Sequence, residues 1–209
     1  AFLLASPCVQ AATTRVRVGI RGGIGEELWT EVAKAAKPKG LDVQLVVLGG
    51  SVSPNEALNN GDLEANAFQH LPFLQDQVRQ RGYQIVPVAN TLIAPIAFYS
   101  RKYKRLQDLP AGARIGIPND PSNQTRALVI LRDHGLIRLR EGFDPFSSTA
   151  GLADVVGNPR QLQLVEAASY VLARSVPDLD AAAVINTFAY QVGLIATRDG
   201  IAVEKREHN

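Results

Sequence analysis

The chain has 209 residues, of which 46% are hydrophobic and 20% are charged. This composition is typical of globular proteins and excludes a disordered or fibrous chain, and the length suits one large domain or two small ones. The 22 basic and 20 acidic residues leave a net charge of +2, and the densest basic run, residues 101–105, is short. We interpret that run as a solvated connector and expect no nucleic-acid partner.

The first twelve residues, AFLLASPCVQAA, are apolar and end in small residues. This pattern is typical of the tail of an export signal, and a structural N-terminal segment is the alternative. Cys8 is the only cysteine, which excludes an intrachain disulfide and a cysteine metal cluster. A lipid attached to Cys8 stays open, although the neighbouring Pro7 fits such a signal poorly. Later in the chain, no apolar run approaches the roughly 20 residues that span a bilayer. We therefore expect a soluble folded part outside the cytoplasm.

The first predicted elements alternate between strand and helix. Residues 14–20 (TRVRVGI) place apolar and basic side chains on opposite sides, which predicts a strand. GGIG at 22–25 ends it, and a helical pattern begins at Glu26 with two acids in its first turn, where the helix dipole favours them. Residues 42–48 predict a second strand, and Pro54 opens a short helix.

The second half continues the same rhythm. Strands are predicted at 113–118, 161–167 and 181–185, and a helix is predicted over 124–134. Strands that alternate with helices indicate an α/β fold with a largely parallel sheet.

Two extended runs in the middle of the chain, residues 83–89 and 91–99, each contain a proline, which a central strand accepts badly. We interpret them as a crossover between two lobes. Residues 13–90 with 187–209 are then predicted to form lobe 1, and residues 91–186 lobe 2. A cleft at such a boundary commonly binds a small ligand.

Catalytic motifs such as G-x-S-x-G, H-E-x-x-H and the P-loop do not occur. GGIGEE has only two of the three glycines of a dinucleotide fingerprint, with Leu28 at the third position, so we interpret it as a strand-to-helix turn. The three histidines, His70, His134 and His208, are far apart and have no second ligand at helical spacing, so we expect no metal. A nucleophile and base that meet only in space stay open. We expect neither an enzyme nor a cofactor.

A polar run, NDPSNQTR at 119–126, stands at the start of a predicted helix. Free backbone N–H groups and the helix dipole suit such a terminus to an anion, and Arg126 could hold a carboxylate in a bidentate grip. The alternative is that Asp120 or Ser122 only caps the helix and that Arg126 faces water.

A second polar and aromatic run, ANAFQHLPFL, occupies residues 65–74. Phe68 and Phe73 could form an apolar wall, and Asn66 and His70 could supply hydrogen bonds. An aromatic wall opposite an arginine suits a hydrophobic amino acid, and a thioether sulfur would gain a further favourable contact with the rings. The alternative is that both phenylalanines belong to the core.

The chain resembles the methionine-binding lipoprotein family (MetQ/NlpA), the substrate-binding components of methionine ABC importers. The runs that carry the resemblance are PNEALNNGDLEANAFQHLPFL (54–74), RGYQIVPVANT (81–91), PIAFYSRK (95–102), IGIPNDPSNQTRAL (115–128) and AVINTFAYQVGL (183–194). The resemblance implies a two-lobed periplasmic-binding-protein fold, similar to type II, that closes over a ligand in the cleft between its lobes. It also implies a periplasmic or membrane-surface location, a permease partner and a monomer.

The resemblance implies roles for particular residues. Phe68, His70 and Phe73 would surround the ligand side chain, Arg126 would hold the carboxylate, and Asn186 would bind the polar end of the amino acid. The family commonly has tyrosine where this chain has Phe73, so a hydroxyl is lost.

The sequence departs from the family pattern in two places. Ser51 stands where the family has an aromatic residue, which leaves a thinner or wetter pocket wall. The family also continues past Asn209, so we expect a C-terminal part to be truncated and the affinity to fall. A methionyl dipeptide, another apolar amino acid or a non-transport surface role are the alternatives to methionine transport.

Overall fold

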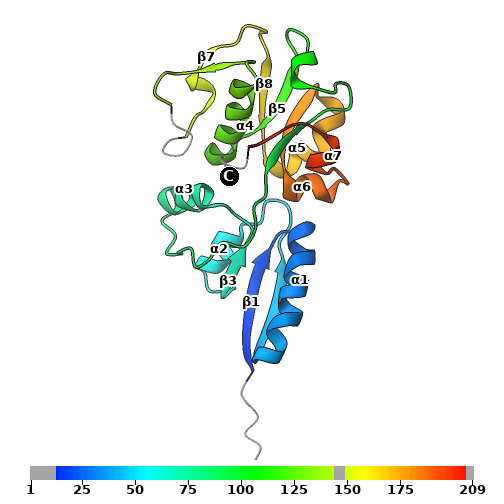
Figure 1. The fold of residues 1–209 in the computed structure, drawn as a ribbon. Coiled ribbons are helices and arrows are strands. Elements are labelled where there is room, and N and C mark those ends of the chain that lie inside the picture. Colours follow the sequence, from blue (N-terminus) through cyan, green and yellow to red (C-terminus); the bar gives the residue numbers. More distant parts are fainter. Residues whose placement is uncertain (1–12, 144–148, 206–209) are drawn as a thin grey trace, which may run out of the picture.

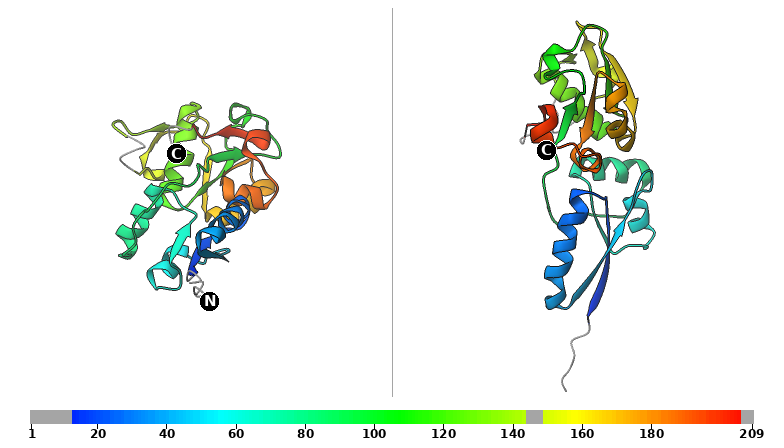
Figure 2. Two further views of the ribbon diagram at one scale, coloured as in Figure 1. Left: turned by 60° about the horizontal axis from the view of Figure 1, so that its bottom comes forward. Right: turned by 90° about the vertical axis from the view of Figure 1, so that its right-hand side faces the viewer.

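The structure is a computed structural model that describes residues 13–143 and 149–205. Figure 1 and the right-hand view of Figure 2 show an elongated molecule in which two α/β lobes are stacked end to end. The predictions for the N-terminal signal, Cys8 and His208 lie outside the described residues.

Lobe 1 is built on a small parallel sheet. Its strands have the order β2-β1-β3, and both neighbours run parallel to β1. The bounds are β1 (Thr14–Ile20), α1 (Ile24–Ala36), the 3-10 helix η1 (Lys37–Lys39), β2 (Leu41–Val47), α2 (Pro54–Asn59), β3 (Ala65–Ala67) and α3 (Leu71–Arg81). The first strand has the bounds that the alternation predicted. Of the GGIG run, Gly22 and Gly23 form the turn between β1 and α1, and α1 begins at Ile24, two residues before its predicted start.

Lobe 2 is built on a mixed sheet with the strand order β10-β4-β9-β5-β8. Its larger elements are β4 (Ile96–Tyr99), β5 (Arg114–Pro118), α4 (Pro121–Asp133), β8 (Gln163–Ala167), α5 (Ser169–Ser175), β9 (Ala181–Ile185), α6 (Asn186–Gln191), α7 (Ala196–Asp199) and β10 (Gly200–Val203). A separate ribbon pairs β6 (Arg138–Leu139) with β7 (Val155–Gly157), and the 3-10 helices are η2 (Leu106–Asp108), η3 (Leu152–Asp154) and η4 (Val176–Asp178).

The core of lobe 2 has two layers because helices cover both faces of its sheet. Along β4, Ile96 and Phe98 belong to the apolar cluster that includes α4, and Ala97 and Tyr99 belong to the cluster that includes α5. All four residues of β4 are buried. A strand buried on both faces is apolar throughout, so Ile96–Tyr99 shows no alternation of apolar and polar residues.

Three details of the predicted organisation need correction or refinement. Residues 82–95 contain neither helix nor strand and join the lobes, as expected for 83–89, but the predicted crossover run 91–99 ends in β4, an inner strand of the lobe 2 sheet. The helix predicted from residue 124 begins at Pro121, because Asp120 caps it. The pairing of β10 with β4 places that strand in the sheet of lobe 2, whereas we assigned residues 187–209 to lobe 1.

In the part of the chain that the structure describes, none of the helices is both long and apolar enough to cross a membrane. The same residues contain no group of three or more His, Cys, Asp or Glu side chains that could hold a metal ion.

Candidate functional site

The aromatic run of lobe 1 is placed by the register of its parallel sheet. Ile20 of β1 is paired with Ala67 of β3, so both strands end at the same edge of the sheet. The residues that follow, Arg21 and Phe68, therefore stand side by side, and the guanidinium carbon of Arg21 lies 5.6 Å from the centre of the Phe68 ring. Carboxyl ends of parallel strands are the usual place for ligand groups in such sheets.

Side-chain amides fix the segment that carries the aromatic rings. Asn55 is fully buried, and its Oδ1 accepts hydrogen bonds from Asn66 Nδ2 at 2.9 Å and from Gln69 Nε2 at 2.6 Å. Asn66 Nδ2 also donates to the Pro54 carbonyl at 3.1 Å. Asn66 therefore stabilises the conformation of this segment through hydrogen bonds with the protein. We had considered it as a group that supplies a hydrogen bond to a ligand.

The rings of this segment form one cluster. The Phe68 and Phe73 rings meet edge to face with centroids 6.0 Å apart, and the His70 and Phe73 rings are 6.4 Å apart. Both phenylalanines are half-buried, so neither is an ordinary core residue. Their exposed parts form an apolar surface that a ligand can cover.

The imidazole of His70 is neutral at physiological pH. Burial first, and then the positive charge of Arg126, lower its pKa from 6.5 to about 3. Its Nε2 atom is buried and has no hydrogen-bond partner among residues 13–143 and 149–205. Buried polar atoms are normally paired, so this atom is a candidate for contact with a ligand.

The opposite wall comes from the corresponding edge of the sheet in lobe 2. Strands β5 and β9 are parallel to each other and both end at this edge. Strand β4 is antiparallel to its two neighbours, β9 and β10, so β4 begins at this edge and β10 ends at it. The arrangement brings together the start of α4, Asn186 after β9, and Glu204 after β10. These positions are far apart in the sequence, and only the sheet topology makes them neighbours.

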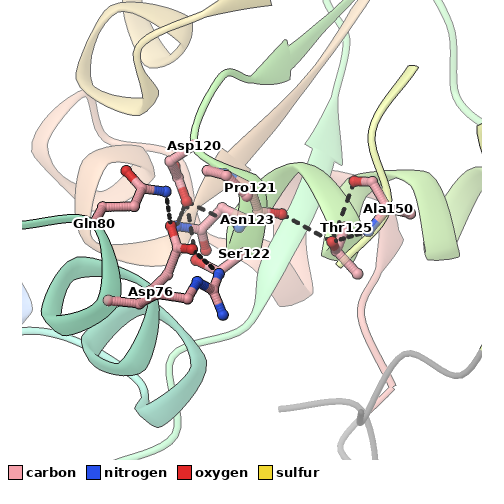
Figure 3. A network of polar contacts seen from close by, with 9 residues as sticks. Asp76, Gln80, Asp120, Pro121, Ser122, Asn123, Thr125 and Ala150 are labelled. Carbon is pink, nitrogen blue, oxygen red and sulfur yellow. Dashed lines mark hydrogen bonds and ion pairs between the residues drawn. The ribbon is translucent and has the colours of Figure 1, made fainter. Parts of the chain in front are cut away.

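The first turn of α4 is held by its cap. Asp120 Oδ1 accepts hydrogen bonds from the Asn123 backbone N–H and the Ser122 hydroxyl, both at 3.0 Å. Figure 3 shows Asp76 and Gln80 of α3 beside this turn, with Gln80 Nε2 donating to Asp76 Oδ2 at 2.7 Å. The carboxylate of Asp76 is buried near the positive end of α4, which is a favourable place for a negative charge. Lobe 1 and lobe 2 therefore meet at α3 and α4.

Arg126 is buried and is largely occupied by groups of the protein itself. Its Nε and Nη2 donate to the two carboxylate oxygens of Glu204 at 2.8 and 2.5 Å. Nη2 also donates to the Ala94 carbonyl, and Nη1 donates to Asn123 Oδ1, each at 2.9 Å. The bidentate grip expected for a ligand carboxylate is thus formed with Glu204, and one hydrogen of Nη1 has no acceptor among residues 13–143 and 149–205.

The alternative interpretation of the polar run at 119–126 was partly right. Asp120 caps the helix, as the alternative stated. Arg126, however, does not face water, because its side chain is only 8% exposed and is paired with the 1% exposed side chain of Glu204.

Asn186 is the first residue of α6. Its backbone N–H donates to the Pro95 carbonyl at 3.1 Å, next to the Ala94 carbonyl that Arg126 contacts. Its half-buried side-chain amide makes no hydrogen bond with any described residue. Ala94 and Pro95 of the crossover thus link Arg126 to Asn186. The side-chain amide of Asn186 stays available to a ligand.

A cavity of about 570 Å³ lies between the lobes. Lobe 1 contributes Arg21 and residues 48–50 to its wall, and lobe 2 contributes residues of α5, η4, α6 and the position after α6, including Phe188. Since Arg21 also covers Phe68, the cavity adjoins the aromatic cluster.

Four of the five predicted site residues are connected by recorded interactions. Phe68, His70 and Phe73 share the aromatic cluster, and the charge of Arg126 acts on His70. Asn186 joins this group only through the crossover at Ala94 and Pro95.

Two residues of this region were missed by the sequence analysis. Arg21 could have been noticed, because it directly follows a strand of a parallel sheet. Nothing in the sequence indicated that Glu204 belongs to the site. A single acid after a short strand is common, and its ion-pair partner Arg126 lies 78 positions earlier in the chain.

Two α/β lobes joined by a crossover, with polar and aromatic side chains meeting at facing sheet edges, define the two-lobed periplasmic-binding-protein fold. The chain belongs to the NlpA lipoprotein family, whose model matches residues 16–209.

Similar proteins include the D-methionine-binding lipoprotein MetQ of Escherichia coli K12, which is 45% identical over 195 residues, or 92% of this chain and 71% of the relative. A solved nutrient-binding protein from Burkholderia cenocepacia bound to methionine is 42% identical, with a TM-score of 0.88 over 91% of this chain and 80% of that one. A periplasmic substrate-binding protein of an ABC transporter from Coxiella burnetii is 40% identical, with a TM-score of 0.83 over 91% of this chain and 79% of that one.

Proposed function

We propose that this protein is an extracytoplasmic substrate-binding protein that binds methionine between its lobes and delivers it to the permease of an ABC importer. The observation that carries the proposal is the meeting of an aromatic cluster on lobe 1 with polar groups on lobe 2 that have unused hydrogen-bonding capacity. The methionine-bound relative and the transporter component with the same fold support it.

The proposed roles follow from the surroundings of each side chain. Phe68 and Phe73 contact the apolar tail of the ligand, and His70 offers its unpaired Nε2. Asn186 and the remaining Nη1 hydrogen of Arg126 hold polar groups of the ligand. The neutral ion pair of Arg126 with Glu204 suits a zwitterionic ligand that carries no net charge.

These roles need binding and release only, so we propose a carrier that leaves its ligand chemically unchanged. Closure of α3 against α4 would enclose the ligand, and opening of the crossover would release it. We further propose that the protein acts as a monomer at the outer face of the membrane and that Cys8, outside the described residues, carries a lipid, as in its lipoprotein relatives.

Methionine is expected to stabilise the protein against heat. A ligand at one hundred times its dissociation constant adds about 2.7 kcal/mol to the free energy of unfolding, because only the folded state binds it. Thermal unfolding with L-methionine, D-methionine and, as a control, L-lysine measures this effect. If neither enantiomer raises the melting temperature at millimolar concentration, the proposed function is wrong.

Replacing Asn186 by alanine is expected to lower the affinity for methionine about tenfold or more, because a hydrogen bond to a charged group of the ligand is lost. The melting temperature without ligand should hardly change, since the amide has no partner among the described residues. Isothermal titration calorimetry measures the affinity. The matched control is Asn60→Ala at the exposed end of α2, and equal affinities of the two variants would contradict the role of Asn186.

A further inference from the structure

Arg21 is a half-buried cation at the boundary between the lobes. Its Nη1 donates to the carbonyls of Leu48 and Gly50 at 2.9 and 3.3 Å, and its guanidinium lies over the Phe68 ring. These partners orient the group, but carbonyl dipoles and a ring do not neutralise a full charge. Burial accordingly lowers the pKa of Arg21 below its usual value.

The protein supplies no counter-ion for this charge in the part that the structure describes. No carboxylate of residues 13–143 or 149–205 forms an ion pair with Arg21, and its Nε and Nη2 have no hydrogen-bond partner there. Arg126 differs, because Glu204 already accepts two of its hydrogen bonds. Cations removed from water are normally paired, so Arg21 is a candidate for pairing with a group other than the described residues.

The space beside Arg21 can hold such a group. Arg21 lines the interlobe cavity of about 570 Å³, which has the size of a small-molecule pocket. The other charged side chains of its wall are Arg174 and Asp178, so the wall carries one positive charge in excess. Phe188 and Val192 of lobe 2 provide apolar surface on the opposite side.

We propose that this cavity is a carboxylate-binding subsite in which Arg21 forms the ion pair with the ligand. The inference rests on the proposed function, because the remainder of the ligand would occupy the adjoining aromatic cluster of Phe68, His70 and Phe73. Arg21 offers Nε and Nη2 together, which is the geometry of a bidentate carboxylate contact. The carboxylate belongs either to a single amino acid or to the C-terminus of a dipeptide, and the two sources can be separated experimentally.

The test compares ligands with and without a carboxylate on the unaltered protein and on Arg21→Gln. L-methionine is paired with L-methioninol, and methionylglycine is paired with its C-terminal amide. Arg21→Gln is expected to weaken binding of one carboxylate ligand about 10- to 100-fold, and to leave its carboxylate-free partner within about twofold. Arg21→Lys, which keeps the charge but loses the bidentate contact, should have an affinity between those of the unaltered protein and Arg21→Gln. Arg15→Gln controls for the change in net charge, because Arg15 lies on β1, the strand that Arg21 follows, and its side chain is 69% exposed.

The outcomes are distinct. A selective loss for methionine assigns the subsite to the amino acid's own carboxylate, and a selective loss for the dipeptide assigns it to the peptide C-terminus. Equal changes for a carboxylate ligand and its partner, or no change, would overturn the inference while leaving methionine binding by the unaltered protein intact. If the unaltered protein binds neither methionine nor the dipeptide, the proposed function fails, and the inference fails with it.

Discussion

Replacing Glu204 by alanine is expected to lower the free energy of unfolding by about 3–5 kcal/mol. The variant leaves the buried guanidinium of Arg126 without the carboxylate that accepts hydrogen bonds from its Nε and Nη2. It also removes the acceptor for the backbone N–H of Ile96 at 3.2 Å. A buried charge without its partner destabilises the folded state far more than the pair contributes when intact.

Chemical denaturation followed by circular dichroism measures the loss. The matched control is Glu31→Ala, because Glu31 forms an ion pair with Lys34 in which both side chains are at least 67% exposed. An exposed pair contributes no more than about 1 kcal/mol. If the two variants have the same midpoint and slope, the ion pair of Arg126 with Glu204 does not stabilise the fold.

The second large effect is a dependence of stability on pH that comes from His70. Its pKa is about 3 in the folded protein and 6.5 when unperturbed, so between these values the unfolded chain binds a proton that the folded protein does not. The stability is therefore fully present above pH 6.5 and decreases as the pH falls toward 3. The expected slope approaches about 1.4 kcal/mol per pH unit.

The variant His70→Gln cannot take up this proton and should have a flatter pH profile. Unfolding free energies between about pH 5.5 and 7 report mainly on the histidine, because carboxylates such as Glu64 take up protons in the unfolded chain only near their unperturbed pKa of 4.5 and below. In the unaltered protein, the NMR signals of the His70 ring should show no titration down to about pH 4. Identical slopes for the variant and the unaltered protein would show that His70 is protonated in the folded state as readily as in the unfolded one.

Several elements could be predicted from the sequence because local patterns determine them. The alternation in residues 14–20 gave the bounds of β1, and the alanine-rich run at 181–185 gave β9. Pro54 marked the start of α2, and the predicted helix end at residue 134 lies one residue after the end of α4. The resemblance to the family, carried by long runs, supplied the two-lobed fold.

The placement of β10 could not be predicted locally. Its four residues pair with β4, about one hundred positions earlier, and the chain returns to that sheet after α6 has met lobe 1. Gln191 Nε2 of α6 donates to the Gly22 carbonyl at 2.8 Å, so the helix does contact the lobe to which we assigned it. Strand pairing over such a distance is set by the sheet topology, which a short apolar run does not reveal.

The sequence by itself determined which residues we propose for the candidate site: the aromatic run with His70, Arg126 near the start of a helix, and Asn186 after a strand. Only the tertiary structure decided how Arg126 is used and which cation remains for a ligand. Glu204 reaches Arg126 because antiparallel β10 ends where α4 begins, and Arg21 stays without an acidic partner in the described chain because β1 ends at the boundary between the lobes. Ion pairing depends on distances in space between charges that are remote in sequence, and those distances are fixed only when the sheets form.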